Sequence, residues 1–211
     1  SGEMELNGSA YHPKSQADAN RKGVSMIVQE ISTLKGLTVA ENIFLGREAE
    51  YTTYGFRDLK KLNQMADKKL KEAGLTEIKP DEDVSHYSLE QRKMIELVRA
   101  ADINPRILMV DETTTALSQT GREELYRLMR KTKEKGNSVL FISHDLAVVR
   151  YVASRVCVMF LGQLCEICPV EDAYQKPLHP YTRMLIDSAP EPDPDFSRED
   201  RMLLEGELPS P

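Results

Sequence analysis

Two adjacent carboxylates, Asp111 and Glu112, directly follow the apolar run Ile107 to Val110. A short, unbroken apolar run is typical of a strand buried on both faces of a parallel sheet. The carboxylates would then lie at the carboxyl end of that strand, where open α/β sheets place their ligand sites. Neighbouring acids repel each other, and a Mg²⁺ ion with an activated water would use both of them. A strand that simply ends in two solvated acids is the alternative.

Polar side chains also follow two other expected strands. Gln29 comes after residues 24–28, and Ser143-His144 comes after residues 138–142. If the three strands are parallel, their carboxyl ends meet at one edge of the sheet. Amide and carboxylate oxygens suit Mg²⁺, and histidine can donate a hydrogen bond to a phosphate oxygen. Taken alone, Gln29 is equally well a polar strand end and His144 a loop histidine.

A helix N-terminus completes this set of polar groups. Ser88-Leu-Glu-Gln91 is a capping box, in which the serine hydroxyl and the glutamine side chain bind backbone N–H groups of the first turn. The free N–H groups and the positive dipole end of such a helix suit a phosphate. Ser88 could equally be only a cap. The combination of all these residues, in this order, indicates nucleotide hydrolysis.

The remaining elements are predicted from capping patterns and apolar spacing. Capping boxes at residues 38–41 and 120–123 predict two further helix starts. Apolar side chains at helical spacing predict a helix over 57–73. The strand–helix alternation from 105 to 160 predicts an α/β fold with a parallel sheet, and the helical block 38–101 is inserted between two of its strands.

The two ends of the chain carry weaker signals. Residues 4–8 predict a weak strand, followed by polar loop up to residue 20. Near the other end the predicted elements are a hairpin of strands 155–160 and 163–167, a short helix over 169–175, and a Pro-rich, acidic extension over 177–211.

Composition narrows the class of protein. The 211 residues include 28 basic and 34 acidic side chains, a net charge of −6, which argues against nucleic acid as a partner. The three cysteines form no disulfide framework, and Cys165 and Cys168 lack the second pair of a zinc site; we expect buried structural cysteines. The apolar stretches are too short to cross a bilayer and the first twenty residues are polar, so we expect a cytoplasmic protein.

The order of these motifs resembles the ATPase domain of ABC transporters. The resemblance covers nearly the whole chain and rests on segments similar to the Q-loop (Val28–Glu30), the signature motif (Tyr87–Gln91), the Walker B strand (Ile107–Glu112), the D-loop (Thr113–Ser118) and the switch histidine (Ser143-His144). In combination these motifs are highly specific.

The resemblance implies a role for each site residue. Asp111 would hold Mg²⁺, together with Gln29, and Glu112 would polarise the water that attacks ATP. His144 would contact the γ-phosphate. The remaining nucleotide-binding residues implied by the resemblance are Gln29, Ser88, Gln91 and Ser118, with Ser88 contacting the γ-phosphate held by the opposite subunit.

The resemblance also implies an architecture and partners. The fold would be a RecA-like P-loop NTPase core, formed by residues 1–44 and 101–168, with a helical subdomain over 45–100 and a C-terminal extension over 169–211. Such domains work as head-to-tail dimers on transporter membrane subunits, so the expected location is the inner face of the cell membrane. ATP hydrolysis would drive the import of a sugar or an oligopeptide.

Three departures from the family pattern qualify this expectation. No G-x-x-x-x-G-K-[ST] sequence, the Walker A loop that cradles the phosphates, occurs in the chain. We therefore expect a core truncated at its N-terminus that binds ATP poorly on its own. Leu89 and Glu90 stand where the signature motif usually has glycines, and Thr113 and Ser118 replace the usual D-loop Pro and Asp.

The third departure is a change of subfamily along the chain. Residues 24–140 resemble carbohydrate-importer ATPases, whereas residues 144–211 resemble oligopeptide- and dipeptide-importer ATPases. The alternatives are an importer ATPase, a non-catalytic half that lends its signature face to a partner, and an inactive hybrid or fragment.

Overall fold

The computed structural model describes residues 2–53 and 55–188. The chain divides into two compact units, Ser1–Ile142 and Ser143–Pro211. No helix in the described ranges has both the length and the apolar character needed to span a bilayer.

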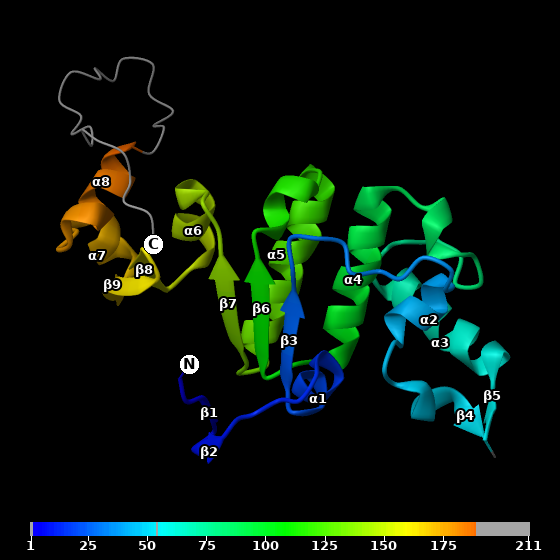
Figure 1. The fold of residues 1–211 in the computed structure, drawn as a ribbon. Coiled ribbons are helices and arrows are strands. Elements are labelled where there is room, and N and C mark those ends of the chain that lie inside the picture. The colour runs from blue at the N-terminus through cyan, green and yellow to red at the C-terminus, as the bar shows by residue number, and fades with distance from the viewer. Residues whose placement is uncertain (1, 54, 189–211) are drawn as a thin grey trace. The chain divides into compact units, whose positions relative to one another are not determined.

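A three-stranded parallel sheet organises the first unit. Its order is β3 (Val24–Ile27), β6 (Ile107–Asp111) and β7 (Ser138–Ile142), with β6 in the centre. Helix α4 (Leu89–Ile103) packs against β3, helix α5 (Gln119–Glu134) packs against β7, and the two helices contact each other (Figure 1). This arrangement confirms the predicted α/β fold and the parallel pairing on which the candidate site depends.

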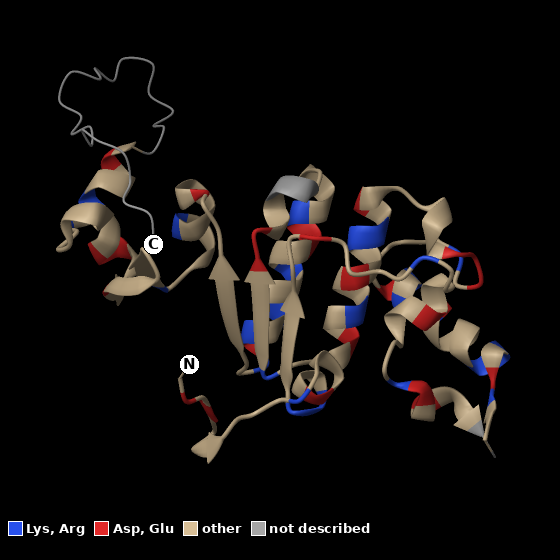
Figure 2. Ribbon diagram, in the orientation of Figure 1, with Lys and Arg blue, Asp and Glu red and all other residues tan. Residues whose placement is uncertain are grey.

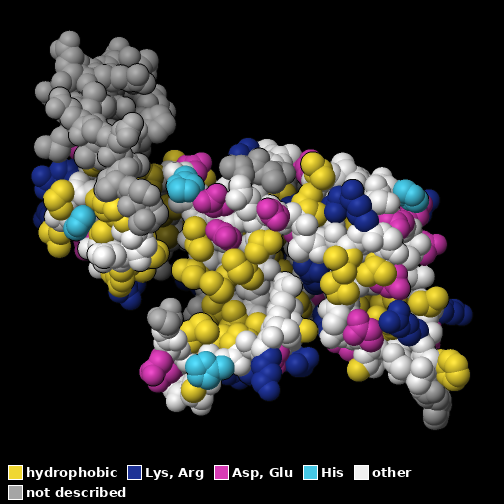
Figure 3. Space-filling view, in the orientation of Figure 1, with side chains coloured by type: hydrophobic (Ala, Val, Ile, Leu, Met, Phe, Trp, Pro, Cys, Tyr) yellow, Lys and Arg dark blue, Asp and Glu magenta, His cyan; other side chains and the backbone are white. Residues whose placement is uncertain are grey.

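The two faces of this sheet differ in their exposure. Leu108 and Val110 of β6 are fully buried. Side chains that alternate onto the other face are exposed: 36% for Met26, 44% for Leu140 and 41% for Ile142. Hydrophobic side chains gather over the strands on this face in Figure 3. The prediction that the Ile107 to Val110 strand is buried on both faces was therefore wrong in part, since Ile107 and Met109 on the second face are only half-buried. Apolar sequence alone does not say what covers a face.

The block inserted between β3 and β6 is helical, as predicted. It contains α2 (Val39–Ile43), the 3₁₀ turn η1 (Glu48–Tyr51), the short strands β4 (Thr52–Thr53) and β5 (Phe56–Arg57), α3 (Leu59–Glu72), the 3₁₀ turn η2 (Val84–His86) and α4. Its core draws on all three helices and includes Val39, Phe44, Leu62, Leu70 and Ile95. The cluster therefore begins at Val39, ahead of the predicted subdomain boundary at residue 45, and the domain division itself stays a prediction.

An ion network ties the end of α4 to the rest of this block. The Asp102 carboxylate contacts Arg47 at 2.7 Å and Lys69 at 2.9 Å. Burial alone would raise the pKa of Asp102, but the hydrogen bonds from Lys69 and Arg47 hold that pKa below its ordinary value. The carboxylate therefore stays ionised between α3 and the segment after α2.

Three local predictions in the first unit need correction. The polar segment after the hairpin of β1 (Glu5–Leu6) and β2 (Ser9–Ala10) is not all loop, because α1 (Gln16–Arg21) begins at the cap Ser15. The predicted strand over residues 4–8 is shorter than expected. Helix α5 is capped by Ser118, whose hydroxyl accepts a hydrogen bond from the Gly121 N–H group at 3.3 Å, and not by Thr120. A capping residue was available two positions earlier, after the 3₁₀ turn η3 (Thr113–Ala116).

The second unit is built on an antiparallel hairpin. Strands β8 (Arg155–Phe160) and β9 (Gln163–Pro169) flank Leu161 and Gly162, as predicted, and both turn residues have positive φ (47° and 74°). Helix α6 (Leu146–Val152) precedes the hairpin, and α7 (Val170–Gln175) and α8 (Pro180–Ser188) follow it. Helix α8 lies in the predicted extension, whose part beyond residue 188 falls outside the described residues.

The cysteines of this unit are not buried as expected. Cys157 is exposed, and Cys165 and Cys168 are half-buried. The hairpin accounts for the exposure of Cys157, which pairs with the exposed Ile167 on the face open to solvent, whereas Cys168 pairs with Val156 on the other face. The buried polar side chain of the hairpin is instead Glu166.

The Glu166 carboxylate fastens the start of α8 to β9. Its two oxygens accept hydrogen bonds from the backbone N–H groups of Leu178 (3.1 Å) and His179 (3.0 Å). The nearby Thr182 hydroxyl, although it does not reach hydrogen-bond geometry, and then those two N–H groups lower the pKa of Glu166.

We expect Glu166→Gln to lower the free energy of unfolding by about 1–2 kcal/mol at pH 7, because hydrogen bonds to a charged acceptor are lost. Since the folded-state pKa is lowered, this contribution is complete above the ordinary carboxyl pKa of about 4.3 and is lost as the pH falls through the folded-state value. Urea unfolding at pH 7 and at pH 3 should therefore show a difference that shrinks in acid. The exposed Glu171→Gln is the matched control, and an equal effect of both variants at pH 7 would contradict this account.

Candidate active site

The carboxyl edge of the sheet brings together the first two parts of the predicted site. Asp111 ends β6 and is paired in register with Ile142, the last residue of β7. On the other side, Val110 pairs with Ile27, so the chain reaches the exposed Gln29 two residues beyond the end of β3. Figure 2 shows the arrows of the three strands in tan, with acidic residues where β6 ends and in the loop after β3. The edge thus offers amide and carboxylate oxygens from neighbouring strands.

Asp111 faces the open side of the sheet. Residues of a strand alternate between its faces, so Asp111 lies opposite Leu108 and Val110, which point toward the helices. Its backbone carbonyl accepts a hydrogen bond from the Thr113 hydroxyl at 2.9 Å, which closes the turn after the strand. The half-exposed carboxylate is therefore accessible beside the apolar face formed by Met26, Leu140 and Ile142.

Glu112 has a backbone conformation that few residues of its kind adopt. Its φ is 42°, in the left-handed region, and its N–H group donates to the Ile142 carbonyl at 3.0 Å. For a residue other than glycine such a conformation costs about 1–3 kcal/mol and persists only where the surrounding structure holds it. The chain therefore turns sharply at the end of β6. Asp111 is still part of the extended strand, whereas Glu112 is not.

The capping box at Ser88 is formed as predicted. The Ser88 hydroxyl accepts from the Gln91 N–H group at 3.2 Å, and the Gln91 side chain accepts from the Ser88 N–H group at 3.0 Å. Ser88 is exposed, and its hydroxyl proton can still be donated to a phosphate oxygen. The cap and the phosphate-binding interpretations of Ser88 are therefore compatible.

Glu90, which replaces a glycine of the signature motif, has a contact of its own. Its carboxylate accepts a hydrogen bond from the Ser118 N–H group at 3.3 Å. This contact joins the first turn of α4 to the cap of α5 and draws the negative charge of Glu90 toward Ser118. The structure thus brings Ser88, Gln91 and Ser118 into one neighbourhood through Glu90.

His144 belongs to the second unit, which begins at Ser143. It is exposed and lies between β7 and the cap of α6, where Asp145 accepts a hydrogen bond from the Val148 N–H group at 3.1 Å. The predicted contact of His144 with the γ-phosphate stays a prediction.

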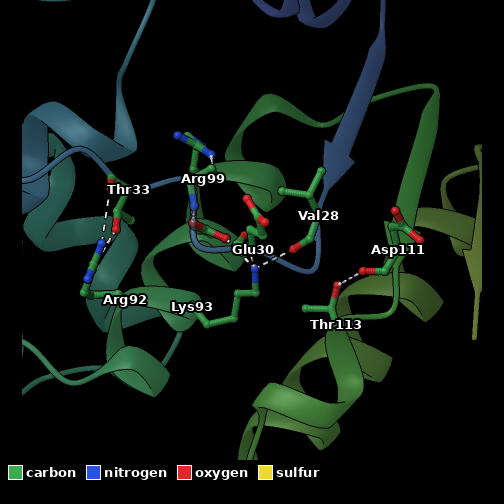
Figure 4. A network of polar contacts seen from close by, with 10 residues as sticks. Val28, Glu30, Thr33, Arg92, Lys93, Arg99, Asp111 and Thr113 are labelled. Carbon is green, nitrogen blue, oxygen red and sulfur yellow. Dashed lines mark hydrogen bonds and ion pairs between the residues drawn. The ribbon is translucent and has the colours of Figure 1, made fainter.

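A buried polar network next to Gln29 was not predicted. Lys93 and Glu96 of α4 form an ion pair at 2.9 Å, and both contact the segment Val28–Thr33 that carries Gln29 (Figure 4). The sequence carries a signal that could have revealed them, because two opposite charges three residues apart interrupt the apolar residues Met94, Ile95, Leu97 and Val98.

The oxygen groups at the edge fit a Mg²⁺ ion that arrives with a nucleotide. Asp111, Glu112 and Gln29 offer two carboxylates and one amide, and the described residues include no group of three or more His, Cys, Asp or Glu side chains able to hold a metal. Mg²⁺ is usually bound by one or two carboxylates, with water and phosphate oxygens supplying the other positions. The donor set therefore suits a metal shared with phosphate.

Comparison with known proteins identifies the family. The sequence profile described as ABC transporter matches residues 1–115, more than half of the chain. The chain belongs to the ABC transporter family. A second profile, described as the C-terminal region of oligopeptide/dipeptide transporters, matches residues 165–211.

Curated relatives and solved structures of ABC proteins agree with this assignment. The chain is 34% identical over 204 residues to the oligopeptide transport ATP-binding protein OppF of Bacillus subtilis, covering 93% of the chain and 66% of that protein. It is 41% identical over 127 residues to OppF of Salmonella typhimurium, covering 59% of the chain and 38% of that protein. The chain thus spans less than two thirds of the length of these curated ABC relatives.

The ABC fold is also seen in solved structures. An ATP-binding subunit of an ABC transporter aligns with a TM-score of 0.60 at 20% identity, covering 74% of this chain and 62% of that one. The ATP-binding cassette MJ0796, solved as a dimer with ADP and Pi, aligns with a TM-score of 0.65 at 22% identity, covering 81% and 74%. These likenesses support the RecA-like architecture of the core.

Proposed function

We propose that the chain is part of the ATP-binding subunit of an ABC importer that couples ATP hydrolysis to peptide uptake. The observation that carries this proposal is the pair Asp111–Glu112 at the carboxyl edge of a parallel sheet, with Asp111 on its open face and Gln29 just beyond the end of the neighbouring strand. Peptide is favoured over sugar because the relatives named above are oligopeptide transport proteins and residues 165–211 match the oligopeptide/dipeptide C-terminal region.

In this proposal each site residue has one task. Asp111 and Gln29 hold Mg²⁺, which neutralises phosphate charge when bound with ATP. Glu112 orients and polarises the attacking water. Ser88, with Gln91 and Ser118 beside it, serves a nucleotide held by a second ATP-binding domain, and His144 contacts the γ-phosphate. The subunit would act with membrane subunits on the inner face of the membrane.

A second candidate function is favoured by a specific observation. The signature end of α4 is formed and is exposed at Ser88. The chain would then be a non-catalytic half that contributes Ser88 to ATP bound by a partner.

ATP hydrolysis should be measured with the chain alone and mixed with a peptide-importer ATP-binding subunit that has a glycine loop. The chain alone should bind Mg-ATP weakly in calorimetry, and Glu112→Gln should change its low rate little. In the mixture, Ser88→Ala should lower the rate about 10- to 150-fold, because a hydrogen bond to a charged phosphate is worth about 1.5–3 kcal/mol. Glu112→Gln should lower the ATP hydrolysis rate of the mixture only if the chain itself hydrolyses ATP.

The matched control is Ser15→Ala, which also removes a helix cap, at α1. Equal rates for wild type and Ser88→Ala in the mixture would contradict both candidate functions. Tight binding of Mg-ATP by the chain alone would contradict a role limited to contributing Ser88 to a partner.

A further inference from the structure

The Lys93 ammonium group binds the backbone on both sides of Gln29. Its Nζ atom donates to the Val28 carbonyl at 2.6 Å and to the Glu30 carbonyl at 3.0 Å (Figure 4). Its third hydrogen bond goes to the Glu96 carboxylate at 2.9 Å. An ammonium group has three protons to donate, so this side chain, which is 0% exposed, is fully used.

Glu96 binds the same segment from the other side of the ion pair. Its second carboxylate oxygen accepts the Ser32 N–H group, and Arg99 donates to the Ser32 hydroxyl at 2.6 Å. One turn earlier, Arg92 donates to the Thr33 hydroxyl at 2.9 Å and to the Thr33 carbonyl at 3.3 Å. Side chains of helix α4 therefore contact the segment Val28–Thr33 from its first residue to its last.

Stability alone does not explain why Lys93 and Glu96 form a buried ion pair at this position. Removing two charges from water costs several kcal/mol per ion, and replacing a buried ion pair by apolar side chains of similar size is often neutral or stabilising. Apolar neighbours on the same helix, such as Ile95 and Leu97, show that aliphatic side chains pack well at this depth. What an apolar pair could not provide is a set of directed hydrogen bonds to the backbone around Gln29.

We propose that Lys93 and Glu96 are positioning residues that hold Gln29 at the carboxyl edge of the sheet, in a fixed relation to the helix capped by Ser88. Lys93 lies five residues after Ser88, about 7.5 Å along the helix axis. A displacement of the signature end of α4 is therefore passed to the Gln29 segment through a rigid helix. The use of Gln29 in the ATPase cycle rests on the proposed function, whereas the positioning itself does not.

The test is amide hydrogen exchange in the double variant Lys93→Met/Glu96→Leu, together with urea unfolding. We expect a urea midpoint much closer to that of the wild type than Lys93→Met alone gives, because no unpaired charge stays buried. Exchange at residues 29–31, away from the Ser32 N–H group that Glu96 binds directly, should be at least tenfold faster, because the Lys93 and Glu96 contacts are gone while those of Arg92 and Arg99 remain. Wild-type exchange rates at residues 29–31 in the folded double variant would show a purely structural pair and would overturn the proposal.

A single variant decides the matter if the double variant does not fold. Glu96→Gln keeps the shape of the side chain but removes its charge, and it should speed exchange at residues 29–31 several-fold. The matched control is Glu90→Gln on the same helix, whose carboxylate contacts Ser118. Equal exchange at residues 29–31 in these two variants would refute the positioning role. Since no nucleotide is present, either outcome is independent of whether the chain hydrolyses ATP.

Discussion

Replacing Lys93 by methionine alone should lower the free energy of unfolding by about 3–5 kcal/mol. The reason is that the partner carboxylate of Glu96, with a side chain only 2% exposed, would remain buried without its cation. The carbonyls of Val28 and Glu30 would lose their donor as well. Urea unfolding with linear extrapolation measures this change.

The matched control for this variant is Lys71→Met on α3. Lys71 also forms an ion pair on one helix, with Asp67 at 2.6 Å, but its side chain is 62% exposed. Such surface pairs are worth about 0–1 kcal/mol, so Lys71→Met should have a small effect. If the two substitutions cost the same, the buried pair would not be held as the structure shows.

Local sequence was sufficient for elements whose determining contacts are themselves local. The capping boxes at Thr38 and Ser88 formed as predicted, because each joins residues three positions apart. The capping box predicted at Thr120 did not form, and the cause is again local: Ser118, two residues earlier, caps the helix instead. Asn104 adopts the αL conformation that ends α4, and Pro105 directly after it cannot continue a helix.

Contacts between distant residues were beyond the sequence patterns. Lys93 meets Val28 across 65 positions of the chain, and periodicity counts Lys93 as a charge that belongs on a solvated face. The open face of the sheet was missed for a related reason, because a strand does not encode which elements cover it. The left-handed backbone of Glu112 likewise follows from the turn after β6 and not from its residue type.

The candidate site was predictable in part because parallel strands impose one geometry. Once β3 and β6 pair in parallel, Gln29 and Asp111 must emerge at the same edge. The network that fixes how Gln29 is held depends on α4, which is inserted between those strands. The sequence thus indicated the polar groups at the edge, while their support required the packing of the helical block.

Replacing Phe44 by alanine should lower the free energy of unfolding by about 3–5 kcal/mol. Phe44 is 1% exposed in the core shared by α2, α3 and α4, so the variant loses the transfer energy of the ring and leaves a cavity. The Arg47 guanidinium lies 4.8 Å from the centre of the ring and would lose a cation–π contact. Urea unfolding would report the total cost.

The exposed Phe56, at 80%, provides a matched control, since Phe56→Ala removes the same ring from the surface of the same block. Its effect should stay within about 0.5 kcal/mol. Because Arg47 also holds Asp102 at the end of α4, Phe44→Ala should further speed hydrogen exchange in the last turn of that helix, whereas Phe56→Ala should not. Unchanged exchange there, despite the loss of stability, would mean that α4 is anchored mainly by the sheet and by Lys93, and not by the helical core.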